Sequence, residues 1–236
     1  MLDERPFDVT PFAQTCLEAA ERAWRGSFEH PFVRALVDGE LDAERFAFYQ
    51  KQDARYLEAF ADAACLLSTQ CHRPDDSLWF VEAAQIALVT EAELHEGYGE
   101  QLGYTREDIA ELELTPNNRA YQNHMISTIQ RDSLLVGTAA LTPCPWLYID
   151  LGVHFENELG TIPDDHPYAE WLKMYSDPQF HEFVDTMLAK LQRFAEPASE
   201  EERERAVEAF RTSARYEWMF WQQAWEPQSW PTERLD

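Results

Sequence analysis

Cys144 is the residue whose surroundings best suit a nucleophile. It lies in the segment Thr142-Pro143-Cys144-Pro145-Trp146. Because proline is tolerated in the first turn of a helix but not in its interior, the chain must either kink within a helix here or begin a new helix after a Thr142 cap. With Thr142 as the cap, the thiol would lie at a helix N-terminus, where the dipole favours the thiolate. Since the thiolate is the reactive form of cysteine, Cys144 is the candidate nucleophile.

Two carboxylates interrupt faces that are otherwise apolar. Between residues 43 and 71, aromatic and aliphatic side chains recur every three or four positions, and Asp53 falls within that stripe. Glu217 lies on the aromatic face of the segment 200–225, between Phe210 and Phe220. An arginine partner or a tyrosine hydroxyl would explain either buried carboxylate alone. The two together favour an aromatic pocket in which acid groups converge.

A rival site could be built from pairs spaced four residues apart, Glu91 with His95 and His154 with Glu158. Such pairs can hold a metal between helices and would suit a metal-dependent oxygenase. Seven histidines in a helical protein also produce such pairs by chance, and Glu217 has no histidine near it. We therefore expect no metal and no other cofactor.

The elements that position these residues are predicted to be helices. The chain has only eight glycines in 236 residues, and no run of alternating β-branched residues suggests a strand. The expected caps are Asp42, Asp76, Thr115, Asp177 and Ser199, the last forming a capping box with Glu202. The prediction is one all-α domain over residues 1–236, with a core at about 10–225 and a tail at 226–236. Its nine helices are 9–25, 31–38, 43–71, 77–102, 116–131, 133–160 with a break at the prolines, 167–175, 178–195 and 200–225.

The charge balance limits the possible partners. The chain carries 44 acidic against 19 basic residues, a net charge of −25. Such a surface repels phosphate backbones and anionic lipids, so we expect neither nucleic acid nor membrane as a partner. An acidic surface with only three lysines suggests a cytoplasmic protein from a high-salt cell. The four cysteines form no CxxC pair, and the N-terminus lacks the pattern of a signal peptide, which also favours the cytoplasm.

Several separate motifs resemble those of the TenA family, or thiaminase II. Motifs that agree in order and spacing are far more specific than any one alone, and the resemblance runs from about residue 10 to 225. The motifs are Trp24 to Val33 with Asp38-Gly39 and Gln52-Asp53, Tyr121 with His124-Met125, Leu141 to Tyr148, His166 to Tyr175, and Tyr216-Glu217 to Trp221.

This resemblance implies a haem-oxygenase-like helical bundle without haem, assembled as a homotetramer. It also implies a thiamin-salvage hydrolase that releases hydroxymethylpyrimidine from aminomethylpyrimidine and from thiamin. Carried over by position, Cys144 is the nucleophile, Glu217 the acid or base, and Asp53 the anchor of the pyrimidine. The aromatic residues placed around the ring are Tyr56, Tyr121, Tyr148 and Tyr175.

Three positions depart from the family pattern. Ala54 stands where an aromatic residue is common, Pro145 follows the cysteine where an aromatic residue often does, and Asp150 replaces the usual glutamate. These departures bear on the shape of the pocket and so on substrate preference. Two alternatives to the hydrolase stay open, the metal-dependent oxygenase and a protein that binds a pyrimidine without turnover, because a fold alone does not determine an activity.

Overall fold

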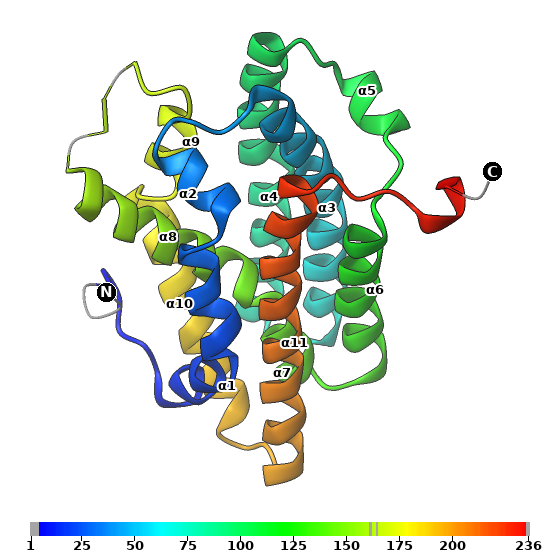
Figure 1. Ribbon diagram of the computed structural model, residues 1–236. Coiled ribbons are helices and arrows are strands. Elements are labelled where there is room, and N and C mark those ends of the chain that lie inside the picture. Colours follow the sequence, from blue (N-terminus) through cyan, green and yellow to red (C-terminus); the bar gives the residue numbers. More distant parts are fainter. Residues whose placement is uncertain (1–4, 161, 164, 235–236) are drawn as a thin grey trace.

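The computed structural model describes residues 5–160, 162–163 and 165–234, apart from the side chains of 90–96 and 233–234. Within this part of the chain every regular element is helical, which confirms the predicted all-α class (Figure 1). The elements are α1 (Pro11–Phe28), α2 (Pro31–Val37), α3 (Ala43–Gln70), α4 (Pro74–Leu102), α5 (Arg106–Glu111), α6 (Pro116–Arg131), α7 (Leu134–Leu141), α8 (Pro143–Leu159), α9 (Ala169–Met174), α10 (Pro178–Ala195), α11 (Glu200–Trp225) and the 3₁₀ turn η1 (Pro231–Arg234).

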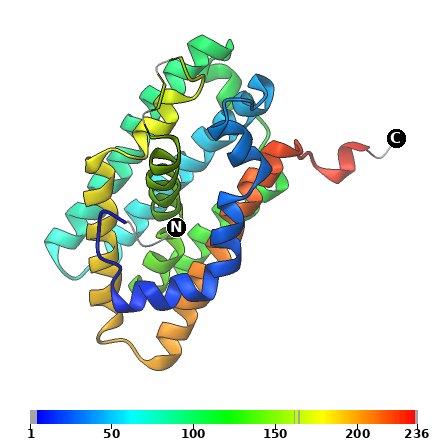
Figure 2. The same ribbon diagram turned by 60° about the vertical axis from the view of Figure 1, so that its left-hand side comes forward.

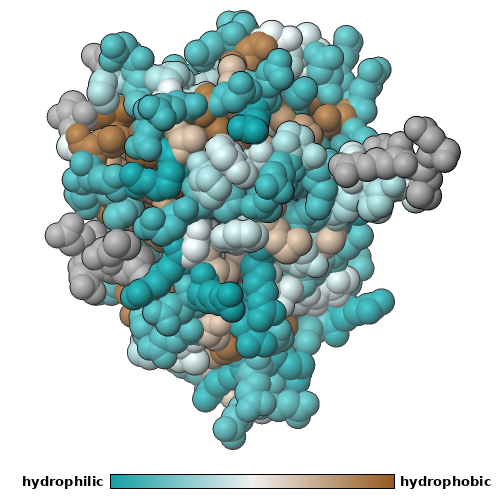
Figure 3. Space-filling view, viewed as in Figure 1, coloured by the Kyte–Doolittle hydropathy of each residue, from teal (hydrophilic) through white to brown (hydrophobic). Residues whose placement is uncertain are grey.

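Helix α7 lies at the centre of the bundle. It packs against α3, α6, α10 and α11, while α3 also lies along α4 and α1 lies along α11. The segment Leu134–Leu159 is long and apolar enough to cross a bilayer by length and composition, but 83% of its most apolar window is buried inside the bundle. That burial is typical of the core helix of a water-soluble protein. The face seen in Figure 3 is mainly hydrophilic, as the net charge of −25 requires.

Most of the predicted caps are confirmed. Asp42 accepts hydrogen bonds from the backbone N–H groups of Glu44 and Arg45, and Thr115 and Asp177 cap α6 and α10 in the same way. The prediction for Asp76 is wrong, because α4 begins earlier, at Pro74. Asp76 lies inside the first turn, where its carboxylate binds Lys190 at 2.8 Å and also Arg193, and so ties α4 to α10.

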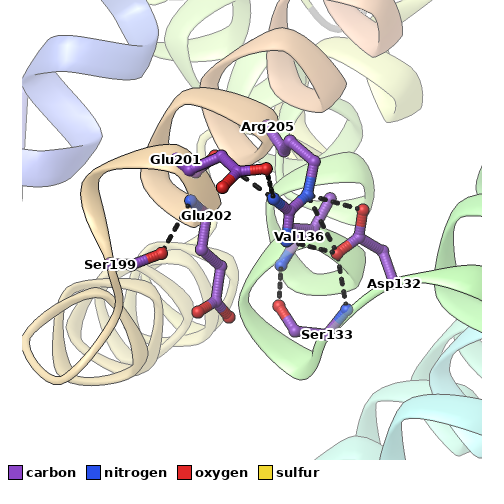
Figure 4. Close-up of polar contacts among 7 residues, drawn as sticks. All are labelled: Asp132, Ser133, Val136, Ser199, Glu201, Glu202 and Arg205. Atoms are coloured by element: carbon purple, nitrogen blue, oxygen red, sulfur yellow. Dashed lines mark hydrogen bonds and ion pairs between the residues drawn. The ribbon is translucent and has the colours of Figure 1, made fainter.

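Two serine caps lie close together where α6, α7 and α11 meet (Figure 4). Ser199 accepts from the backbone N–H of Glu202 at 3.2 Å, and Ser133 accepts from that of Val136 at 3.4 Å. Only the Ser199 half of the predicted capping box is seen among the described contacts, and the Glu202 carboxylate points away from Ser199. Arg205 of α11 instead binds the residue that ends α6, with its Nε 3.1 Å from the Asp132 carboxylate.

The structure contains a short helix that the sequence did not predict. Helix α5 is capped by Thr105 and Asp108 in a reciprocal capping box, and none of its residues is buried. A helix without a buried face has no apolar periodicity, so the pattern search had nothing to find. Beyond α11, the tail is held by Trp230, whose indole N–H donates to the carbonyl of Leu114 at 3.0 Å, while η1 projects from the bundle (Figures 1 and 2).

Candidate active site

Cys144 lies at the second position of α8, where α7 runs into α8 almost without interruption. Thr142 is the boundary residue of both helices and has helical dihedral angles, φ −61° and ψ −37°. Its hydroxyl donates to the carbonyl of Thr138 at 2.8 Å, so it does not cap α8, and the second of the two predicted possibilities is ruled out. The chain therefore continues through the prolines as one interrupted helical segment, which is the first of the two predicted possibilities. Because the C-terminal end of α7 abuts the N-terminal end of α8, their opposite dipole charges partly cancel at Cys144.

A small cavity opens beside the thiol. Its volume is about 50 Å³, and Cys144, Asp53, Tyr148 and Tyr175 all line it. Four of the seven residues proposed from the sequence, from α3, α8 and the end of α9, therefore meet at one hollow. The remaining wall is apolar and aromatic, consisting of Leu57, Phe60, Ala83, Ile86, Ala87, Pro145, Phe180 and Phe183.

Glu217 does not line this cavity, and neither does its hydrogen-bond partner Tyr121, but the charge of Glu217 acts on Tyr148 of the cavity wall. The side chain is 2% exposed, and Oε1 accepts a hydrogen bond from the Tyr121 hydroxyl at 2.5 Å. Burial raises the pKa of Glu217 from 4.5 to about 8, and the Tyr121 hydrogen bond opposes that rise only in part. A carboxyl group with such a pKa can give up a proton and take it back near neutral pH.

Tyr56 and Tyr121 connect Glu217 to Cys144. Burial raises the pKa of both phenols well above the ordinary value, and the charges of Cys144 and Glu217 act on both in the same direction. The rings of Tyr56 and Tyr121 are 4.8 Å apart, and Tyr216 stacks on Tyr121 at 5.2 Å. The thiol and the carboxyl are thus within electrostatic reach of the same pair of hydroxyls.

The Tyr148 hydroxyl is within electrostatic reach of both Asp53 and Glu217. This hydroxyl lies 3.0 Å from that of Tyr49, a residue of the α3 stripe that was not among the proposed site residues. Burial raises the pKa of Tyr148, and the charges of Tyr49, Asp53 and Glu217 act on it in the same direction. Asp53, 5% exposed, lies on the buried face of α3 as its spacing predicted.

Gly152 sets the position of Tyr175. A Cβ atom at Gly152 would lie 2.5 Å from the carbonyl oxygen of Tyr175 and 2.6 Å from its carbonyl carbon, so only glycine permits this approach. Cys144, Tyr148 and Gly152 follow one another at intervals of four on α8 and share one face. The backbone of Tyr175 therefore rests on that face, with its ring 4.9 Å from that of Tyr148.

The sequence analysis missed the residues that close the cavity from the outside. Phe180 and Phe183 on α10, and Ala83 and Ala87 on α4, are spaced three and four residues apart. Such spacing is typical of any core-facing helix, so it did not distinguish a site from ordinary packing. Pro145, noted as a departure from the family pattern, is part of the cavity wall.

The rival metal site does not form among the side chains that the structure describes. The side chains of Glu91 and His95 lie outside it. His154 Nε2 is 3.6 Å from Glu158, but the Glu158 carboxylate binds the guanidinium of Arg34 through two hydrogen bonds of 3.0 and 2.8 Å. Among the described side chains, no three of His, Cys, Asp or Glu are grouped as a metal would need.

Proteins with similar sequences and structures are known. Residues 17–227 match the model of the TENA/THI-4/PQQC family. An aminopyrimidine aminohydrolase from Halalkalibacterium halodurans is 32% identical over 220 residues, which is 93% of this chain and 97% of that protein. A TenA homologue from P. horikoshii OT3 superposes with a TM-score of 0.80 at 28% identity, covering 91% of this chain and 98% of the other.

A more distant structure confirms the predicted architecture. A domain of unknown function from Shewanella denitrificans OS217, described as having a heme oxygenase-like fold, superposes with a TM-score of 0.70 over 93% of this chain and 94% of the other. At 11% identity this likeness concerns the fold alone. With a family model that spans most of its length and a relative matched end to end, this chain belongs to the TENA/THI-4/PQQC family.

Proposed function

We propose that this protein is a thiamin-salvage hydrolase, an aminopyrimidine aminohydrolase that releases hydroxymethylpyrimidine from aminomethylpyrimidine and from thiamin. The observation that carries the proposal is one cavity lined by Cys144 and Asp53, with Glu217 hydrogen-bonded to Tyr121 and its charge acting on Tyr148 of the cavity wall. A relative that covers almost the whole chain bears the name of this activity. The partner is a small pyrimidine.

Cys144 serves as the nucleophile in this proposal. Direct displacement of an amine by water at the pyrimidine methylene is slow, because water is a weak nucleophile and the amine a poor leaving group. The thiolate instead adds to the ring carbon next to the substituted one, and the electron-rich ring expels the amine. Water then adds to the exposed methylene, the C–S bond breaks, and the thiolate returns. Two easier steps replace one hard step, and each turnover consumes one water.

Glu217 serves as the acid and then as the base. Its neutral form gives a proton to the departing amine, and the resulting carboxylate takes a proton from the incoming water. The pKa of about 8 supports both uses near neutral pH, since neither form is strongly disfavoured. Tyr121, which donates to Glu217 at 2.5 Å, provides the connection toward Tyr56 and the thiol.

Asp53, which lies on α3, anchors the pyrimidine. An ionised Asp53 accepts hydrogen bonds from the amino group or a protonated ring nitrogen, which stabilises the ring as it gains electron density. The rings of Tyr148 and Tyr175, 4.9 Å apart and both lining the cavity, offer faces and edges for a flat heterocycle.

The proposed enzyme acts as a homotetramer in the cytoplasm of a high-salt cell. Large apolar side chains point outward from α4, where Leu78, Val81, Leu88 and Val89 are between 46% and 58% exposed. Such a stripe supports contact with further copies. The net charge of −25 supports a surface that needs salt to screen its repulsion. Light scattering and thermal unfolding at low and high salt test both ideas.

Replacement of the thiol tests the proposed chemistry. We expect Cys144→Ser to lower the release of hydroxymethylpyrimidine from both substrates by about a thousandfold or more, since the hydroxyl is a far weaker nucleophile. Cys65→Ser is the matched control, because Cys65 is an exposed free cysteine on α3. Wild-type turnover by Cys144→Ser would end the covalent mechanism. Pyrimidine binding without turnover in the wild type would favour a binding protein.

A further inference from the structure

Tyr49 is buried close to the candidate active site but is not part of the cavity wall. It lies on α3, four residues before Asp53, so the two side chains share the buried face of that helix. Asp53 lines the cavity and Tyr49 does not. An effect of Tyr49 on the reaction would therefore have to pass through a side chain that lines the cavity.

Tyr148 is such a side chain. The hydroxyl oxygens of Tyr49 and Tyr148 are 3.0 Å apart, which is within hydrogen-bond distance. Tyr148 lines the cavity and lies on α8, four residues after Cys144 and on the same face. One contact between two hydroxyls therefore connects the helix that carries Asp53 to the helix that carries Cys144.

These two helices have different main packing partners. Helix α3 packs chiefly along α4 and α6, whereas α8 packs chiefly against α9, α10 and α11. The contact between Tyr49 and Tyr148 spans α3 and α8 directly. It therefore bears on the distance between two walls of the cavity, the one that carries Asp53 and the one that carries Cys144.

We propose that Tyr49 is a positioning residue, whose hydroxyl holds Tyr148 and thereby sets the gap across which the thiol must reach the pyrimidine. This inference rests on the proposed function, in which Cys144 attacks a ring anchored by Asp53. The rate of such an attack depends strongly on geometry, and a misplacement of about 1 Å can cost about a hundredfold. A hydroxyl that fixes the gap can therefore affect the rate without touching the substrate.

The surroundings of Tyr148 explain why its hydroxyl needs this partner. Burial raises the pKa of the Tyr148 phenol well above its ordinary value, and the charges of Tyr49, Asp53 and Glu217 act in the same direction. The phenol therefore keeps its proton at neutral pH, and a buried hydroxyl that loses its hydrogen bond is unfavourable. Without the Tyr49 oxygen, the Tyr148 hydroxyl would turn toward other polar groups. Asp53 and Glu217, whose charges act on it, are groups that the proposed reaction uses.

Aromatic packing holds the Tyr49 ring independently of its hydroxyl. Trp221 stacks on this ring with the centroids 5.5 Å apart, and the rings of Phe32 and Phe220 lie at 5.3 and 6.1 Å. Trp221 also lies 5.0 Å from the ring of Tyr148. Replacement of Tyr49 by phenylalanine would therefore remove one oxygen atom and leave the ring in place.

Steady-state kinetics of Tyr49→Phe on aminomethylpyrimidine test the proposal. We expect kcat to fall about tenfold and KM to change less than about twofold, because Asp53 still anchors the ring while the thiol is held less well. Tyr168→Phe is the matched control. The Tyr168 hydroxyl is also buried and donates to the carbonyl of Leu41 at 2.6 Å, but Tyr168 does not line the cavity. Folded Tyr168→Phe should keep the kcat of the wild type.

A double variant distinguishes positioning from a general loss of stability. If Tyr49 acts through Tyr148, the variant that combines Tyr49→Phe with Tyr148→Phe should have the kcat of Tyr148→Phe alone, within about twofold. A role in stability alone would not produce this dependence. Because the double variant removes both hydroxyls of the contact, it also keeps the proposal testable if Tyr49→Phe alone does not fold.

The outcomes separate this inference from the proposed function. An unchanged kcat in Tyr49→Phe, an equal loss in Tyr168→Phe, or a further loss in the double variant beyond that of Tyr148→Phe would overturn the positioning role and leave the proposed function standing. A wild type inactive on aminomethylpyrimidine would overturn the proposed function and the positioning role with it. A loss in Tyr49→Phe that vanishes when Tyr148 is already phenylalanine would confirm the role.

Discussion

Glu217 and Asp150 are two carboxylates buried to a similar depth in the same bundle, at 2% and 5% exposure, yet their partners differ in kind. Asp150 accepts hydrogen bonds from Arg5 at 2.8 and 2.6 Å and from the indole of Trp24 at 2.9 Å. Glu217 accepts one from a tyrosine hydroxyl. Burial raises the pKa of both, but for Asp150 a neighbouring cation opposes it.

The role of a buried carboxylate is therefore indicated by its hydrogen-bond partner rather than by the depth of its burial. A carboxylate held by a guanidinium is a fixed anion that ties two segments together, here the N-terminal segment and α8. A carboxyl without a cation can exchange its proton at little energetic cost, as acid–base catalysis requires. Substitution of each carboxylate in turn tests this difference.

Among the changes that bear on these two carboxylates, the largest effect is expected from Glu217→Gln. The amide can still accept the Tyr121 hydrogen bond but can neither give nor take the proton, so kcat for aminomethylpyrimidine should fall about a hundredfold or more. Steady-state kinetics measure this loss. Asp150→Asn is the matched control, and its folded form should keep kcat close to that of the wild type. Equal losses in the two variants would show that the comparison does not separate catalysis from structure.

The same variant should also flatten the dependence of stability on pH. Glu217 takes up a proton at pH values up to about 8 in the folded state but only up to about 4.5 when unfolded. Between these values the unfolded chain has ionised while the folded chain has not, so the free energy of unfolding falls as pH rises. Urea titrations from pH 4 to 9 should show a loss of up to about 5 kcal/mol that Glu217→Gln lacks.

A smaller effect on stability is expected from Asp150→Asn. The Arg5 side chain is 11% exposed and would lose its carboxylate, although an N-terminal segment can move its cation into water. We expect the free energy of unfolding to fall by about 1–3 kcal/mol, below the loss from breaking a fully buried pair. Urea unfolding at neutral pH measures it. Unchanged stability with a lower kcat would assign Asp150 to the reaction.

The smallest effect is expected from Gly152→Ala, which acts on the position of Tyr175 alone. The added methyl would displace the Tyr175 backbone from α8, so KM for aminomethylpyrimidine should rise about fivefold with a smaller change in kcat. Gly97→Ala is the matched control, because a Cβ there meets no atom nearer than 3.9 Å. If Gly152→Ala lowers only the melting temperature and leaves KM unchanged, the close approach serves packing rather than binding.

Helix positions could be predicted because their causes are local. Asp177 and Pro178 begin α10 at the predicted residue, and Ser199 begins α11 likewise. A cap acts on N–H groups two or three residues away, so it can be read without knowing the fold. At Thr142, which joins α7 to α8, the local pattern left a kink and a new helix both open, because the helical conformation of this residue depends on neighbours that the pattern does not reveal.

For the site, the sequence could show which residues face inward but not what they meet. The stripe on α3 placed Asp53 on the buried side, and the aromatic face of α11 did the same for Glu217. The partner of Glu217, Tyr121, is 96 residues away in the chain, and that of Asp150, Arg5, is 145 away. No spacing rule connects residues so far apart, since such contacts arise only from helix packing.

The amino-acid order by itself determined the helical class, most helix ends, the inward direction of two carboxylates and the strong negative charge, because each depends on composition or on residues within a turn or two. Tertiary structure alone decided that α7 and α8 form one interrupted helical segment, that Asp150 is paired while Glu217 keeps a pKa near 8, and that Cys144 and Asp53 line one cavity. These features depend on which surfaces meet across the bundle, and the free energy of burial sets that arrangement for the chain as a whole.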